Sequence, residues 1–153
     1  MNEKGQEMQD LPHQYRVSAD AKSSGNVVLS SDGVADLPSA PPAEFGGPGD
    51  QWSPESLLVA AVADCFILSF RAIARASRLD WDSLTCSVDG TLDRVDRATQ
   101  FTGFKVSATL HVPSGSDEEK AQRLLEKAEH ACLITNSLKA ESELESTVHV
   151  ATA

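Results

Sequence analysis

The sequence lacks the motifs that mark the common cofactor and metal sites. It contains no GxGxxG and no GxxxxGK[ST] run, so the glycine loops that hold nucleotide phosphates are absent. It contains no CxxC pair, and its four histidines do not have zinc-finger spacing; only His130 and Cys132 are near neighbours. Two ligands are too few for a closed zinc site. We therefore expect no cofactor and no bound metal.

Positive charge is also scarce. The chain has 13 Lys+Arg against 23 Asp+Glu, for a net charge of −10. Nucleic acids and anionic membranes are bound through clustered cations, so we expect neither as a partner. No signal peptide is visible at the start, and the apolar run at residues 57–70 is shorter than a bilayer-spanning segment and carries Asp64. Three cysteines in such a chain predict a reducing compartment, the cytoplasm.

The length of 153 residues predicts one domain with a core of its own. Residues 1–12 are polar and are expected to be a flexible N-terminus, which leaves residues 13–153 as the domain. Short strands are predicted at residues 13–21, 26–31 and 34–37, because turn residues separate short apolar stretches there.

A long buried helix is predicted at residues 53–78. Ser53 suits the N-cap, Pro54 the first helical position and Glu55 the first turn. Residues 57–70 are apolar on every side of the helix apart from one aspartate and one serine, and such a helix belongs inside a protein.

The segment before this helix, residues 38–49, reads PSAPPAEFGGPG and cannot hold regular structure. It contains Phe45 and is followed by Trp52, so apolar side chains alternate with chain breakers. A long loop with aromatic residues is either a lid over a pocket or a surface connection, and the sequence does not decide between them.

The second half of the chain predicts strands at residues 84–92 and 104–112, where apolar and polar side chains alternate. Ser116 and Glu119 form a capping box for a helix that carries four small or apolar residues on one face: Ala121, Leu124, Leu125 and Ala128. A short helical piece at residues 133–140 and a strand at residues 144–150 complete the pattern. This order predicts an α+β fold with mainly antiparallel strands around the long central helix.

Each of the three cysteines has a different predicted environment. Cys86 lies on the inward face of an alternating strand and is expected to pack as a small hydrophobe. Cys65 has mostly apolar helix neighbours, which fit core packing, while Cys132 follows a polar helix end near His130 and Asn136, which favours redox work. A disulfide between Cys65 and Cys132 requires Cα atoms within about 7 Å, which the sequence cannot show.

The runs SPESLLVAAVADCF and HACLITNSLKA resemble the OsmC/Ohr family (osmotically inducible protein C and organic hydroperoxide resistance protein) of thiol peroxidases. The resemblance implies an intertwined homodimer with an α+β fold. It implies that Cys65 attacks an organic hydroperoxide and becomes a sulfenic acid, and that Cys132 resolves it as a disulfide. A dithiol, such as a lipoyl group, then reduces the disulfide.

The resemblance also implies an arginine that activates the thiol and is held by Glu55. The upstream segment where that arginine is often found reads PAEF here, and Lys22 is the one cation between Arg16 and Arg71. Glu55 and Cys65 are about 15 Å apart along a helix, so Glu55 cannot touch the thiol itself. Arg16 or a cation from the partner subunit can take the missing role; otherwise Glu55 is only a first-turn charge.

A second departure is Leu133, where many family members have proline after the resolving cysteine. Three hypotheses follow. The favoured one is a peroxidase for organic hydroperoxides; the alternative is a divergent member that binds a small apolar ligand without turnover. The third is a purely structural or interaction dimer.

Overall fold

A computed structural model describes residues 8–153, which fall into two compact units, one ending at Pro54 and one comprising Glu55–Ala153. In chain order the elements are β1 (Ser18–Asp20), β2 (Val27–Ser30), β3 (Leu37–Ser39), the 3-10 turn η1 (Ala43–Phe45), α1 (Pro54–Ala76), β4 (Ser83–Val95), β5 (Ala98–Val112), α2 (Glu118–Ala131), α3 (Leu133–Asn136) and β6 (Glu141–Val150). The α+β class with a long helix is confirmed. Of the predicted flexible segment 1–12, residues 1–7 lie outside the described part of the chain, and residues 8–12 are exposed and form no helix or strand.

The first unit is a small antiparallel sheet in the order β1-β2-β3. The predicted turn between the first two strands is confirmed, and Gly25 adopts a φ of 92° there, which suits glycine. The loop after β3 is closed at its ends, because the Ala40 N–H donates to the Trp52 carbonyl at 2.9 Å. Phe45 and Trp52 are 60% and 48% exposed. For the loop at residues 38–49, a lid over a pocket and a surface connection both stay predictions.

The second unit is built on a sheet in the order β4-β5-β6. β4 and β5 form the predicted antiparallel hairpin, whose turn places Asp96 and Arg97 at φ values of 50° and 71°. The strands are mainly antiparallel, as predicted, but β6 pairs with β5 in parallel. The physical reason is the connection: α2 and α3 carry the chain back along the sheet, and a crossover of this kind joins parallel strands.

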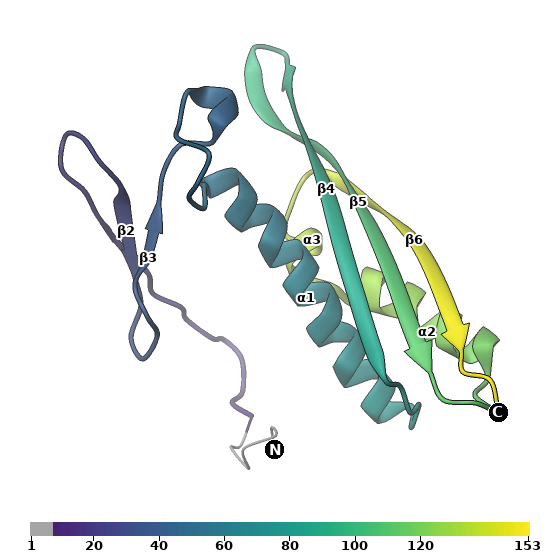
Figure 1. Ribbon diagram of the computed structural model, residues 1–153. Helices are drawn as coiled ribbons and strands as arrows, with labels where there is room; N and C mark the ends of the chain where they lie inside the picture. Colours follow the sequence, from purple (N-terminus) through teal and green to yellow (C-terminus); the bar gives the residue numbers. More distant parts are fainter. Residues whose placement is uncertain (1–7) are drawn as a thin grey trace. The chain divides into compact units, whose positions relative to one another are not determined.

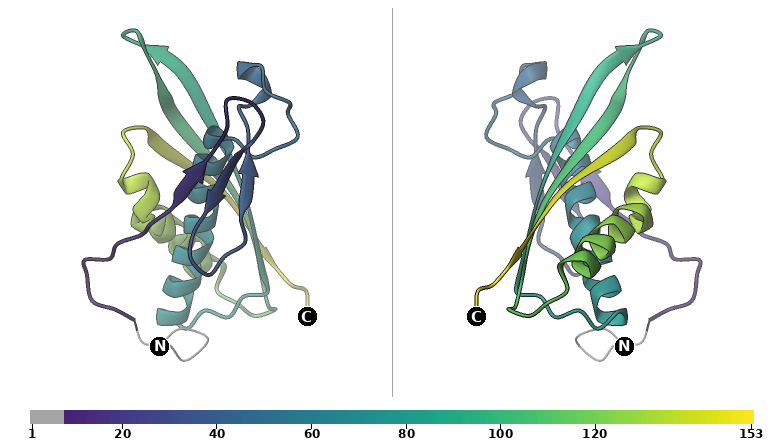
Figure 2. Two further views of the ribbon diagram at one scale, coloured as in Figure 1. Left: turned by 90° about the vertical axis from the view of Figure 1, so that its left-hand side faces the viewer. Right: turned by 90° about the vertical axis from the view of Figure 1, so that its right-hand side faces the viewer.

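Both α1 and α2 cover the same face of this sheet, and the opposite face is open (Figures 1 and 2). The side chains of β5 alternate accordingly, and those on the helical side form the centre of the core: Phe104, Val106, Ala108, Leu110 and Val112. The predicted inward face of α2 is confirmed, since Ala121, Leu124, Leu125 and Ala128 are all buried. The core therefore lies between one face of the sheet and two helices.

α1 begins at Pro54, directly after the buried Ser53, as predicted. Its four fully buried side chains form one stripe along the helix: Val62, Phe66, Phe70 and Ala74. The helix approaches β4 so closely that a Cβ on Gly90 would lie 2.8 Å from Val59 Cγ2. Leu68, on another side, is 50% exposed. A single sheet covers only one side of a helix, so an all-round apolar α1 has apolar surface that this sheet does not cover.

The helix is longer than the apolar run at residues 57–70, which was expected to be too short to span a bilayer. α1 has 23 residues and is long and apolar enough, by length and composition alone, to cross a bilayer. The stripe of α1 that includes Phe66 and Phe70 belongs to the core against the sheet, as in the core helix of a globular domain. Directly after the last residue of α1, the Ser77 carbonyl accepts a hydrogen bond from Lys120 Nζ at 2.8 Å, which links the end of α1 to α2.

The predicted capping box of the next helix is wrong. The N-cap is Asp117, whose side chain accepts a hydrogen bond from the Lys120 N–H at 3.1 Å. Ser116 belongs to the preceding turn, where its N–H donates to the Pro113 carbonyl at 3.2 Å and Gly115 adopts a φ of 81°. Because this turn takes up Ser116, the helix begins one residue later.

Candidate functional site

Cys65 lies in the middle of α1, beside the buried stripe rather than in it. The residue is half-buried, between the fully buried Val62 and Phe66 on one side and the exposed Leu68 on the other. Its Sγ lies 3.9 Å from the Ser69 hydroxyl, one helical turn onward. The thiol thus combines apolar surroundings with partial access.

Glu55 lies in the first turn of the same helix, seven residues before Val62 and therefore on the sheet-facing side. Within residues 8–153, its Oε2 atom is shielded from water and has no hydrogen-bond partner. A buried carboxylate oxygen without a donor is costly, by about 1–3 kcal/mol or more for a charged group. Glu55 is therefore short of a partner, and a cation is the partner that suits it best.

Arg16 belongs to the first unit, where it lies in a small polar hollow of about 130 Å³. The hollow is lined by Ser18, Ser30, Ser31 and Asp32 as well. The Ser31 hydroxyl donates to the Arg16 carbonyl at 2.9 Å and so holds the Arg16 backbone. The Arg16 residue itself is exposed. Its role as substitute for the family arginine remains a prediction.

Cys132 is buried, with only 2% exposure, at the junction where α2 ends and α3 begins. Its carbonyl accepts hydrogen bonds from the Asn136 N–H at 3.0 Å and the Thr135 hydroxyl at 3.1 Å. The Asn136 side chain donates to the His130 carbonyl at 3.0 Å. The polar neighbours that the sequence associated with Cys132 therefore hold the backbone of the junction.

The structure places a second thiol, Cys86, near Cys132, a proximity that the sequence pattern did not predict. Cys86 lies on the helix-covered face of the sheet, packed against the core as predicted, and close enough to Cys132 for their charges to interact. Burial, and then the neighbouring Cys132, raise the pKa of the Cys86 thiol to about 11. All three cysteines are free thiols. The inward position of Cys86 on its strand was the available signal; its proximity to Cys132 depends on how α2 packs.

A family model described as "OsmC-like protein" matches residues 47–147. The chain belongs to the OsmC-like family. Among its relatives, the uncharacterized protein YmaD of Bacillus subtilis is 31% identical over 109 residues, covering 68% of this chain and 71% of that protein. The organic hydroperoxide resistance protein of Xanthomonas axonopodis pv. citri is 31% identical over 112 residues, covering 72% and 77%.

Solved structures of OsmC-like proteins share this fold. An OsmC-like protein of unknown function from Vibrio cholerae superimposes with a TM-score of 0.81 at 20% identity, over 89% of this chain and all (100%) of that one. An organic hydroperoxide resistance protein from Elizabethkingia anophelis gives a TM-score of 0.73 at 21% identity, covering 94% and 100%. At these identities the likeness establishes the fold of this OsmC-like protein.

The raised pKa of Cys86 makes a testable prediction for this OsmC-like protein. At pH 8 about one Cys86 in a thousand is a thiolate in the folded protein, and only the thiolate is alkylated. We expect iodoacetamide to leave Cys86 unmodified near pH 8 and to label it faster as the pH approaches 11, measured by peptide mass spectrometry. Protein unfolded in urea is the control and should be labelled at pH 8. Rapid labelling of folded Cys86 at pH 8 would contradict the assignment.

Metal chemistry has no obvious place near these cysteines. Across residues 8–153, no group of three or more His, Cys, Asp or Glu side chains is arranged to hold a metal ion. The two predicted participants in thiol chemistry, Cys65 and Cys132, lie in the middle of α1 and at the junction of α2 and α3.

Proposed function

We propose that this OsmC-like protein is a cysteine peroxidase that reduces organic hydroperoxides, with Cys65 as the attacking thiol and Cys132 as the resolving one. The observation that carries the proposal is the position of Cys65: a partly accessible thiol beside apolar side chains that α1 leaves uncovered. A hydrophobic peroxide can bind against this surface with its oxygens at the sulfur. The names of relatives agree, including the organic hydroperoxide resistance protein above and peroxiredoxin OsmC of Escherichia coli, 29% identical over 93 residues.

The proposed cycle has three steps. The Cys65 thiolate attacks the terminal peroxide oxygen, the O–O bond breaks, and the alkoxide takes a proton to leave as an alcohol. Cys132 then attacks the sulfenic acid, forming the Cys65–Cys132 disulfide and releasing water. A dithiol reduces this disulfide by thiol–disulfide exchange and is itself oxidised to a disulfide. We propose a lipoyl-type dithiol as the reductant.

Glu55 is proposed as a positioning residue in this cycle. Its unpartnered buried oxygen suits a guanidinium, which can hold a hydrogen bond to Glu55 while its charge favours the Cys65 thiolate. Arg16 or a cation from the partner subunit is the proposed donor. A homodimer is part of the proposal, because the uncovered apolar side of α1, marked by Leu68, gains shelter from a second copy.

The proposal predicts one disulfide after a single turnover. Reduced protein is treated without oxygen with one equivalent of cumene hydroperoxide, quenched with acid and mapped by mass spectrometry. We expect two of the three thiols to disappear and a peptide pair linking Cys65 to Cys132 to form, with the same pair in a Cys86→Ala control.

Other outcomes of this experiment identify the rival assignments. A pair linking Cys86 to Cys132 would move the resolving role and refute the proposed cycle. Three titratable thiols after exposure to peroxide would refute the peroxidase. If 2-phenyl-2-propanol then still binds at Cys65, the ligand-binding alternative is correct.

A further inference from the structure

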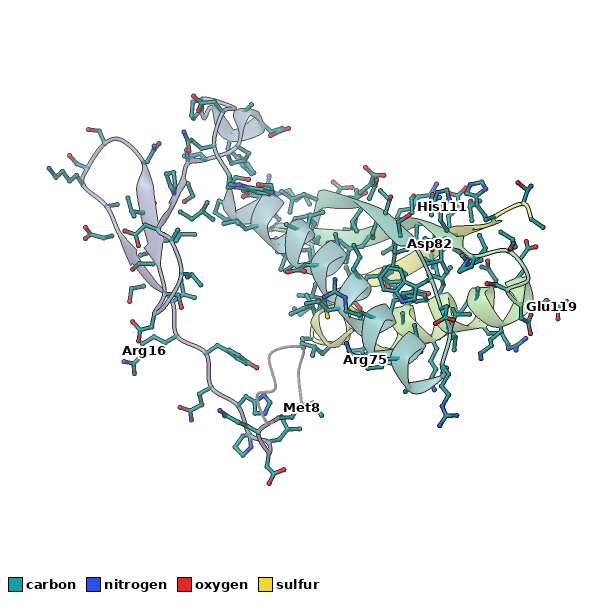
Figure 3. All side chains as sticks on the ribbon, turned by 60° about the horizontal axis from the view of Figure 1, so that its bottom comes forward. Met8, Arg16, Arg75, Asp82, His111 and Glu119 are labelled. Carbon is teal, nitrogen blue, oxygen red and sulfur yellow. The ribbon has the colours of Figure 1, made fainter. Side chains whose placement is uncertain are left out.

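Two histidines face each other on the open side of the second unit's sheet. His111 of β5 and His149 of β6 are direct partners in the parallel register, and both side chains are exposed. Their rings stack with centroids 4.9 Å apart at an interplanar angle of 26°. Figure 3 shows His111 on the side of the sheet away from Arg75 of α1. We propose that His111 and His149 form an open two-histidine site for a first-row transition-metal ion such as Zn²⁺ or Ni²⁺.

The spacing of the two rings suits a shared ion. Zinc binds imidazole nitrogen at about 2.0–2.1 Å, so two nitrogens on one tetrahedral ion lie roughly 3.3 Å apart. The two stacked rings project from neighbouring strands toward the same side, with their centroids 4.9 Å apart. Neutral imidazole is the commonest metal ligand in proteins, and it is suited to zinc, copper and nickel.

The backbone that carries the two rings is held in place on both sides. The His111 carbonyl accepts a hydrogen bond from the Asp82 N–H at 2.8 Å, next to the start of β4. On the other side, the Ala151 N–H donates to the Val112 carbonyl at 3.0 Å and extends the pairing beyond His149. The ligands therefore sit on rigid strands rather than on a loop, which reduces the cost of ordering them around an ion.

The site is open, with two protein ligands. Across residues 8–153 no third His, Cys, Asp or Glu completes a metal cluster, so water or another ligand fills the remaining positions. The sequence indicated no metal site because His111 and His149 lie far apart in the chain, and a ligand pair is recognised from sequence only when its members are close together. Only the parallel register of β5 and β6 brings them together.

The test uses NiCl₂ as the probe and the imidazole ring protons as the readout. Paramagnetic Ni²⁺ at substoichiometric amounts should broaden the ring signals of His111 and His149 while those of His13 and His130 stay sharp. In a titration, His111→Gln and His149→Gln should each raise the Kd for Ni²⁺ at least about tenfold. His130→Gln, which removes an exposed histidine at the end of α2, is the matched control and should leave the Kd unchanged.

Two results would overturn the proposal. Broadening centred on His13 or His130 would place the ion elsewhere. A Kd that is unchanged in both glutamine variants but weakened by Cys65→Ser would assign the binding to the thiols. Because the ring signals are read on the unaltered protein, a variant that folds poorly does not remove the test.

Discussion

We expect replacing Cys65 with serine to lower turnover of cumene hydroperoxide at least about a thousandfold, because the substitution removes the sulfur of the proposed nucleophile. Serine has nearly the same size and keeps the contact with Ser69 feasible, so the local packing of α1 changes little. Its hydroxyl stays protonated and cannot form a sulfenic acid. The measurement is peroxide loss with dihydrolipoamide as the reductant, followed over time with a ferrous-oxidation dye assay.

Two further variants sharpen this prediction. Cys132→Ser should consume about one equivalent of peroxide and then stop, because a sulfenic acid forms on Cys65 but no disulfide follows. Cys86→Ala is the matched control; it removes a thiol whose high pKa keeps it protonated, and turnover should stay within about twofold of the original. Peroxide turnover that survives Cys65→Ser would exclude Cys65 as the nucleophile.

The largest expected loss of stability comes from Phe70→Ala. Phe70 is fully buried in the stripe of α1 and meets Trp81 edge-on, with ring centroids 5.5 Å apart at 74°. Removing a buried phenylalanine costs about 3–5 kcal/mol, since transfer energy is lost and a cavity remains. Urea unfolding followed by circular dichroism measures the change in the free energy of unfolding.

Leu133→Ala provides the comparison for this substitution. Leu133 is 66% exposed on α3 in the same unit, so its truncation should change the free energy of unfolding by no more than about 0.5 kcal/mol. Equal losses in the two variants would mean that α1 does not pack against the sheet through Phe70.

Local sequence patterns predicted the helices and strands correctly where burial depends on contact with a single neighbouring surface. The alternation in β5 and the inward face of α2 follow from side-chain directions along a strand and a helix, which depend on neighbours in sequence alone. The start of α1 after Ser53 likewise follows from local chemistry. The start of α2 did not, because the turn at Gly115 takes up Ser116 and leaves Asp117 as the cap.

The sequence by itself determined the family pattern, the α+β class and the two predicted thiols, because motif, composition and periodicity are properties of short segments. Only the tertiary structure decided the parallel pairing of β6, the proximity of Cys86 to Cys132, and the stacking of His111 on His149. Each of these joins residues far apart in the chain, and a register between distant strands is set by how the whole core packs. For the same reason, the buried Glu55 oxygen became visible as an unfilled site only once α1 had been placed against its sheet.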